Sequence, residues 1–152
     1  MSKGNANKRA GTGEERRVLK LLVAHDPDGE WESRTTDIHG ERRSCGHALT
    51  HGFDVWSVKR AAYLEVKLRK RHITQAQISK WAEQVMAQTA VNGSVHIAYR
   101  QKRGDAWVAE VYPSLNTWDT EPFSHWVNRQ VIEAAEHERW EISEKSNDQA
   151  SP

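Results

Sequence analysis

Residues 53–72 read FDVWSVKRAAYLEVKLRKRH and contain two strand-like runs, 53–58 and 61–68, separated by Lys59 and Arg60. The first run is rich in β-branched and aromatic residues, the second alternates apolar and polar residues from Tyr63, and the interval between them is short. We therefore expect an antiparallel hairpin, although the preferred Asn-Gly turn is missing. The residues on this hairpin decide both the fold and the candidate site.

Strand geometry divides the second run into two faces, because side chains two residues apart point to the same side. Leu64, Val66 and Leu68 form an apolar face that can pack against a helix. Glu65 and Lys67 lie on the opposite face. A strand whose polar face meets only solvent has no particular need of this acid-base pair.

Asp54 lies in the first run, eleven residues before Glu65. A turn near Lys59 brings these two carboxylates close together across the hairpin. Carboxylates that converge in this way repel each other unless a cation lies between them. Lys67 can supply that charge, and a divalent cation supplies more of it; hard oxygen ligands suit Mg²⁺ or Mn²⁺. Each of these residues taken alone is more simply explained as surface charge.

The rest of the chain predicts an α/β protein with a central mixed β-sheet flanked by helices. Upstream, we expect a helix from Thr12 that places Glu15 with Val18, Leu19 and Leu22, then a strand over 31–36 and a long loop over 37–52. The later elements follow in order along the chain: a helix from Ile73 with Ile78, Trp81, Ala82, Val85 and Met86 on one stripe, strands over 94–100 and 106–112, and a helix from about Thr120.

Composition bounds the organisation of the molecule. At 152 residues, we expect one domain over 11–142, with disordered segments over 1–10 and 143–152. Cys45 is the single cysteine, so no intramolecular disulfide forms and a reducing compartment is expected. No apolar run is long enough to span a membrane, so we expect a cytoplasmic protein without a membrane partner.

The formal net charge is only +1, but basic residues gather at the N-terminus and in the middle of the chain while acids gather at the C-terminus. A basic patch attracts nucleic-acid phosphates, and the alternative is a solvated charged surface. The basic residues that we expect to contact a DNA backbone are Lys8, Arg9, Arg16, Arg34, Arg69, Lys70 and Arg71.

An Asp followed by a Glu-x-Lys triplet on a hairpin and then by a helix resembles the PD-(D/E)xK nuclease superfamily. GTGEERRVLKLL, residues 11–22, resembles the opening helix of archaeal Holliday junction resolvases and related phage endonucleases. ITQAQISKWAEQV over 73–85 and GDAWVAEVYPSL over 104–115 resemble later elements of that family. The resemblance covers about residues 11–135. Phe53 stands where the superfamily usually has proline, and the 37–52 loop is longer than in the resolvases.

The resemblance implies a restriction-endonuclease-like fold and a Mg²⁺- or Mn²⁺-dependent endonuclease that cleaves Holliday junctions or other branched DNA. Cleavage leaves a 5′-phosphate and a 3′-hydroxyl. A junction has two symmetric scissile sites, so a homodimer is expected. The implied catalytic residues are Glu15, Asp54, Glu65, Lys67 and Gln75, and the implied metal ligands are Glu15, Asp54, Glu65 and the carbonyl of Val66. Gln77 competes with Gln75, and Ser33 and Ser44 are both candidates for the serine that the resolvases carry in a loop.

Three alternatives remain open at this point. The enzyme could nick or degrade unbranched or single-stranded DNA, as phage nucleases do. The chain could instead be a catalytically silent nucleic-acid-binding protein of the same fold. Finally, the 37–52 loop contains His39, Cys45, His47 and His51, which could bind structural zinc, although no CxxC accompanies them.

Overall fold

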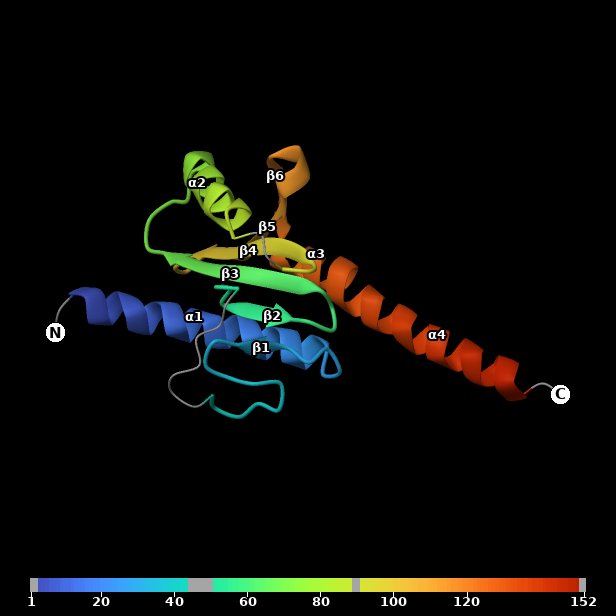
Figure 1. The fold of residues 1–152 in the computed structure, drawn as a ribbon. Coiled ribbons are helices and arrows are strands. Elements are labelled where there is room, and N and C mark those ends of the chain that lie inside the picture. The colour runs from blue at the N-terminus through green and yellow to red at the C-terminus, as the bar shows by residue number, and fades with distance from the viewer. Residues whose placement is uncertain (1–2, 44–50, 89–90, 151–152) are drawn as a thin grey trace.

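The computed structural model describes residues 3–43, 51–88 and 91–150. Six strands form one sheet in sequential order, with only β3 and β4 parallel (Figure 1). The strands are β1 (Glu32–Ser33), β2 (Val55–Ser57), β3 (Ala62–Arg69), β4 (Ser94–Gln101), β5 (Ala106–Tyr112) and β6 (Thr117–Pro122). The expected α/β class with a mixed central sheet is confirmed.

Four α-helices accompany the sheet. They are α1 (Lys3–His25), α2 (Gln75–Met86), α3 (Phe123–Trp126) and α4 (Glu133–Ala150), with a π-helical segment over Val127–Ile132 and a short 3-10 turn over Pro113–Leu115. Parallel strands need a crossover connection, and α2 supplies it between β3 and β4. The hydroxyl of Thr74 begins α2 by accepting a hydrogen bond from the Gln77 amide at 3.2 Å.

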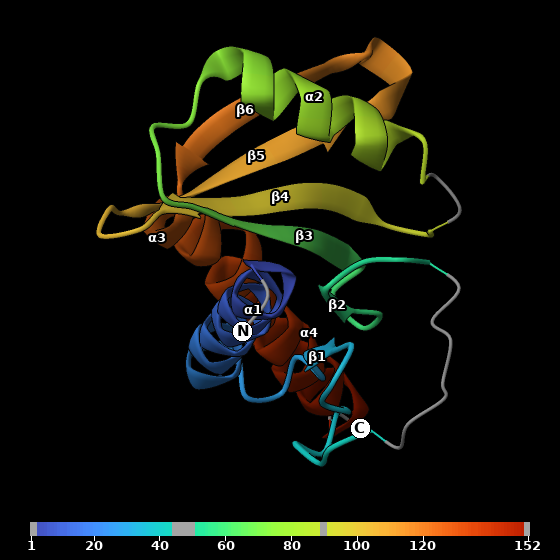
Figure 2. The same ribbon diagram turned by 90° about the vertical axis from the view of Figure 1, so that its left-hand side faces the viewer.

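Two hydrophobic cores lie on the two faces of the sheet (Figure 2). On one face, α1 packs with α3 and the π-helical segment against the sheet through residues such as Leu22, Leu64 and Trp126. On the other face, α2 packs through the predicted stripe of Ile78, Trp81, Ala82 and Val85. The helical periodicities of both segments therefore predicted their buried faces correctly.

The predicted hairpin is confirmed, with β2 and β3 antiparallel and Trp56 opposite Tyr63. The predicted hairpin between β4 and β5 is confirmed as well. The 31–36 strand is wrong in length, because only Glu32 and Ser33 pair with β2. Thr36, the last residue of the predicted strand, forms an isolated bridge with Arg42 in the expected 37–52 loop. Residues 44–50 of that loop lie outside the described part of the chain.

The segment after Pro113 also differs from the prediction. Thr117–Pro122 forms β6, which pairs with β5, and the helix begins at Phe123 rather than near Thr120. Little in TWDTEP favours a strand except Thr and Trp. Its strand conformation follows from hydrogen bonding to the edge of β5, which a local pattern does not reveal.

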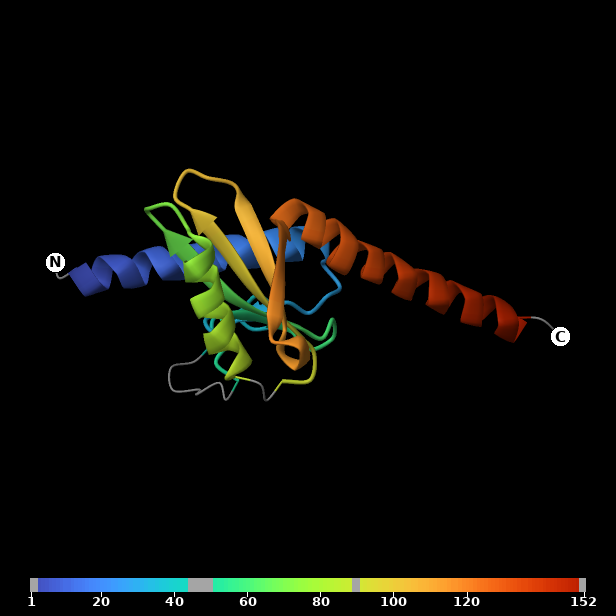
Figure 3. The ribbon, with the colours of Figure 1, turned by 90° about the horizontal axis from the view of Figure 1, so that it is seen from above.

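The helices at the two ends are longer than predicted. α1 begins at Lys3 rather than near Thr12, and α4 continues to Ala150, so residues 3–10 and 143–150, which were expected to be disordered, are helical. Both segments contain the helix formers alanine and lysine, and the second also contains glutamate. Figures 1 and 3 show these helices extending past the sheet at opposite ends of the molecule. Among the described residues, no helix is long and apolar enough to cross a membrane.

Candidate active site

Asp54 lies immediately before β2 and is held against β3 by two backbone contacts. Its amide donates to the Leu64 carbonyl at 3.0 Å. Its carboxylate Oδ2 accepts from the Val66 amide at 2.8 Å. The register that pairs Val55 with Leu64 puts Asp54 across the ladder from Glu65, as the hairpin predicts. The backbone of the hairpin therefore fixes Asp54 beside the Glu-x-Lys triplet.

Glu15 reaches the same place from α1. Its neighbours Val18, Leu19 and Leu22 are buried against the sheet, and this packing turns Glu15 toward the hairpin. Glu15 and Asp54 are 5% and 6% exposed, respectively. The helix that the sequence placed far upstream thus contributes a buried carboxylate to the site.

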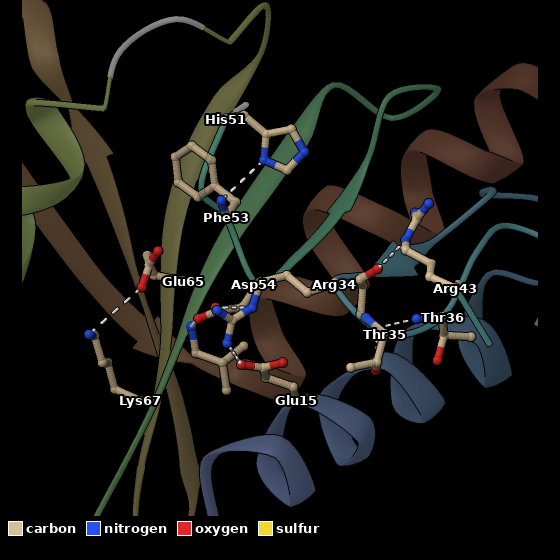
Figure 4. Close-up of polar contacts among 12 residues, drawn as sticks. Glu15, Arg34, Thr35, Thr36, Arg43, His51, Phe53, Asp54, Glu65 and Lys67 are labelled. Carbon is tan, nitrogen blue, oxygen red and sulfur yellow. Dashed lines mark hydrogen bonds and ion pairs between the residues drawn. The ribbon is translucent and has the colours of Figure 1, made fainter. Parts of the chain in front are cut away.

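Arg34 lies between these two carboxylates (Figure 4). Its Nη2 pairs with Glu15 Oε1, and its Nε lies 3.1 Å from Asp54 Oδ1. The Arg34 amide also donates to the Asp54 carbonyl at 3.2 Å, which fixes the backbone of Arg34 beside the hairpin. The side chain of Arg34 is nevertheless 52% exposed, so its guanidinium can leave without disrupting a core.

The short loop around Arg34 is tied down by its neighbours. Ser33 is buried, and its hydroxyl accepts from the Thr36 amide at 3.1 Å. Arg43 pairs with Glu32 and donates to the Ser33 carbonyl at 2.8 Å. Ser33 therefore serves a turn, and Ser44, the other candidate for the loop serine, lies outside the described residues.

Glu65 points toward Lys67, with 3.7 Å between Glu65 Oε2 and Lys67 Nζ (Figure 4). Burial and then the charge of Asp54 raise the pKa of Glu65 to about 7, and Lys67 and Arg34 only partly oppose this. Burial and the Asp54 charge also raise the pKa of Glu15, although the hydrogen bond from Arg34 opposes the shift. Three crowded carboxylates thus hold more negative charge than the two cations beside them neutralise.

The donor types fit a hard divalent cation, because three carboxylates converge, and burial together with the charge of Asp54 raises the pKa of the other two. As the side chains stand, however, the described residues contain no group of three or more His, Cys, Asp or Glu side chains arranged to hold a metal. Arg34 separates Glu15 from Asp54, and Glu65 points toward Lys67. Joint coordination therefore requires Arg34 to move aside.

Of the remaining candidate site residues, Val66 lies beside the carboxylates, and Gln75 and Gln77 lie on α2. Val66 lies next to Glu65 on β3, and its amide already binds Asp54. Gln75 is exposed at the start of α2, and no hydrogen bond joins it to the carboxylates in the described part of the chain. Gln77 contacts other residues instead of the carboxylates. With its amide flipped, its side-chain oxygen accepts from Arg69 Nη2 and from Trp81 Nε1, both at 3.2 Å.

The basic residues expected to contact DNA divide into three groups. Arg34 belongs to the carboxylate cluster, a role that the sequence did not predict because its partners lie far along the chain. Arg16 is exposed on α1, and Arg69, Lys70 and Arg71 are exposed at the end of β3, with Arg69 over the Trp81 ring at 5.5 Å. Lys8 and Arg9 lie in the part of α1 whose side chains the structure does not describe.

Only two of the four candidate zinc ligands, His39 and His51, lie in the described part of the chain. Cys45 and His47 lie outside the described residues. His39 is exposed, and its amide binds Asp37 at 2.9 Å. His51 instead packs against Trp56, with ring centroids 4.3 Å apart, and its Nδ1 accepts from the Phe53 amide at 3.1 Å. Burial lowers the pKa of His51, which fits a packed neutral ring.

Comparison with known proteins adds no further constraint. No protein-family model matches the chain, and neither the curated proteins nor the solved structures searched contain a match. The function must therefore be argued from the site itself.

Proposed function

We propose that this protein is a metal-dependent endonuclease of the PD-(D/E)xK type that hydrolyses phosphodiester bonds in branched DNA. One observation carries the proposal: Glu15 from α1, Asp54 before β2 and Glu65 on β3 converge beside Lys67. A structural ion-pair cluster has no use for this excess of buried negative charge, whereas a site for a cation and a phosphate does.

Each member of the cluster has a distinct task in such an enzyme. Glu15, Asp54, Glu65 and the carbonyl of Val66 would hold Mg²⁺ or Mn²⁺. When bound, the ion polarises the phosphoryl group and lowers the pKa of an attacking water. Lys67, whose side chain is 31% exposed, would contact the scissile phosphate and stabilise the negative charge that develops on it.

Gln75 would contact a phosphate oxygen or the attacking water, and its exposed position at the start of α2 leaves it accessible to DNA. The exposed cations Arg16, Arg69, Lys70 and Arg71 would bind phosphates along the strand without reading sequence. The products would be a 5′-phosphate and a 3′-hydroxyl.

A four-way junction would place two scissile phosphates in symmetric positions, so we propose a two-fold homodimer as the active form. Such an enzyme would work in the cytoplasm of a bacterial, archaeal or phage-infected cell. A related activity on unbranched or single-stranded DNA would use the same cluster and would need no second copy.

A second function deserves a test because of one contact. Arg34 already lies between Glu15 and Asp54, as a permanent counter-charge would in a silent DNA-binding protein. In that case Arg34 would stay in place, and the protein would bind DNA in the presence of Mg²⁺ without cutting it.

The experiment compares cleavage of a four-way junction, a flapped duplex, a linear duplex and a single strand, each with Mg²⁺ and with chelator. We expect Mg²⁺-dependent cutting, fastest on the junction and absent in the Asp54→Asn variant. Asp119→Asn is the matched control, because Asp119 is exposed on β6. Equal cutting of junction and linear DNA would contradict the branched substrate, and intact cleavage by Asp54→Asn would contradict the catalytic assignment.

A further inference from the structure

A cavity of about 360 Å³ opens beside the candidate active site, between the start of α2 and the ends of the central strands. Its walls include the aromatic rings of Tyr99, Trp107 and Trp118, together with His72, Gln75 and Thr120. The volume falls within the range of small-ligand sites, and a mixture of aromatic walls and a few polar groups is typical of them. The cavity is therefore large enough for one planar aromatic ring.

The strand register connects this cavity to Lys67. On adjacent strands, Lys67 lies opposite Tyr99, and Tyr99 lies opposite Trp107. Residues that pair in register point to the same face of a sheet, so the three side chains form one row across β3, β4 and β5. Since neighbouring strands are about 4.8 Å apart, Trp107 lies roughly 10 Å from Lys67 along this row.

Trp107 is unusual among the aromatic residues of the sheet because the residue is 40% exposed. Tyr99 is 8% exposed and packs against Trp81, with ring centroids 6.2 Å apart. Tyr99 thus forms a packed wall, while Trp107 is a partly exposed aromatic residue at the edge of the cavity. An exposed indole beside a preformed cavity is a surface for stacking a flat ring.

Charge beside the cavity indicates which flat ring it accepts. Arg69, Lys70 and Arg71 are exposed where β3 leaves the sheet, and the cavity itself is lined by His72 and by one carboxylate, Asp105. The Lys102 amide donates to the Arg69 carbonyl at 2.7 Å, which holds the β4–β5 hairpin against this basic run. Figure 2 shows the start of α2 and the β4–β5 hairpin at the same end of the sheet. A basic run next to stacking aromatic rings is the combination that binds single-stranded nucleic acid.

We propose that this cavity binds an unpaired nucleobase of the DNA, stacked on Trp107, while the basic run of 69–71 holds the neighbouring phosphates and Lys67 contacts the phosphate to be cleaved. The inference rests on the proposed nuclease function and adds that, among branched DNAs, the protein prefers branch points at which a nucleotide near the scissile bond is unpaired or becomes unpaired on binding. Stacking is sequence-tolerant because every base has a π-face, so the cavity selects DNA structure rather than sequence.

The test measures binding in chelator, where no cleavage competes. The probes are a blunt duplex and the same duplex with a short single-stranded flap that carries 2-aminopurine at the first unpaired position. We expect the wild-type protein to bind the flapped DNA more tightly and to quench the 2-aminopurine fluorescence. Trp107→Ala should weaken flap binding by about 5- to 100-fold and abolish the quench, while blunt-duplex affinity changes less than about twofold.

Two further variants keep the result interpretable. Trp107→Phe retains a ring and should recover most of the flap affinity, which a general loss of folding would not allow. Trp140→Ala removes a tryptophan that is 59% exposed on α4 and should leave both affinities unchanged. A wild-type protein that quenches 2-aminopurine no more than Trp107→Ala does would overturn the cavity assignment. Failure of the wild-type protein to bind either DNA would instead contradict the proposed nuclease.

Discussion

Among the clusters of carboxylates and arginines along α1, the one around Asp54 and the one around Asp26 differ in charge balance. Arg60 binds both oxygens of Asp26, at 2.8 and 2.9 Å, and Trp31 Nε1 donates to Oδ2 at 2.9 Å. The side chain of Arg60 is only 8% exposed and also pairs with Glu138 on α4. This cluster joins the end of α1 to the β2–β3 turn and to α4.

The pKa values record the difference. Burial by itself would raise the pKa of Asp26, but Arg60 and Trp31 outweigh it and the pKa falls. Around Asp54, burial and the repulsion between carboxylates outweigh the nearby cations, and the pKa of Glu65 rises to about 7. Arg34 is 52% exposed, so its charge is partly shared with solvent. A balanced, buried arginine therefore marks a structural cluster, whereas the surplus of buried carboxylates beside an exposed arginine is the feature that we propose serves a binding site.

The largest expected effect is on stability, at Asp26. Asp26→Asn leaves Arg60 buried beside a neutral partner, so we expect the free energy of unfolding to fall by about 3–5 kcal/mol. Urea unfolding at pH 7 measures the change. Asp28→Asn is the matched control, because Asp28 is exposed and the expected change is within about 0.5 kcal/mol. If Asp26→Asn lowered the free energy of unfolding by less than about 1 kcal/mol, the cluster around Asp26 would not be a major structural contact.

At the other cluster, the large effect is on cleavage. Glu65→Gln keeps the shape of the side chain but removes its charge, so we expect cleavage of junction DNA to slow by about 10²–10³-fold with the fold intact. Glu138→Gln is the corresponding change in the structural cluster. It should leave the cleavage rate within about twofold, because Glu138 pairs with Lys59 and Arg60 and not with any residue of the candidate site. Equal losses of cleavage rate in Glu65→Gln and Glu138→Gln would contradict a catalytic role specific to the cluster around Asp54.

The same substitution has a pH-dependent effect on stability. The folded state holds the Glu65 proton up to about pH 7, whereas the ordinary pKa is 4.5, so ionisation of Glu65 destabilises the fold as pH rises through this interval. Glu65→Gln should therefore be more stable than the wild type by about 1–3 kcal/mol at pH 8 and nearly equal to it at pH 4. Urea unfolding in chelator at both pH values measures this. A variant that is less stable at pH 8 would contradict the raised pKa.

The smallest expected effect concerns Arg34, which competes for the carboxylates that a metal would use. Arg34→Gln should tighten Mn²⁺ binding at pH 8 by about tenfold, because the ion no longer displaces a guanidinium. Calorimetric titration of Mn²⁺ measures the affinity. Arg16→Gln is the control, since Arg16 is exposed on α1. Weaker binding in Arg34→Gln would assign the arginine a supporting role instead.

The hairpin and two helix faces could be predicted from the sequence because their signals are local. Alternation in YLEVKL separates Glu65 and Lys67 from Leu64 and Val66, and the apolar period of α1 places Glu15 beside buried residues. The turn between the strands then brings Asp54 to Glu65. These residues fall within short windows, where pattern reflects geometry directly.

The contacts that were missed join residues far apart along the chain. Arg34 meets Glu15 across 19 residues, and Arg60 meets Asp26 across 34. β6 depends on the edge of β5, and the row from Lys67 to Trp107 depends on the register of three strands. Local periodicity carries no information about which strands pair, so neither the counter-charge of the site nor the cavity beside it could be read from the sequence.

The central claim is that Glu15, Asp54 and Glu65 form a site for a divalent cation. The most direct measurement is Mn²⁺ binding at pH 8, followed by the electron paramagnetic resonance of the free ion, in the wild type, Asp54→Asn and Asp119→Asn. We predict saturable binding in the wild type and in Asp119→Asn, and an affinity at least about tenfold weaker in Asp54→Asn. Equal affinity in all three proteins, or no saturable binding to the wild type, would contradict the claim.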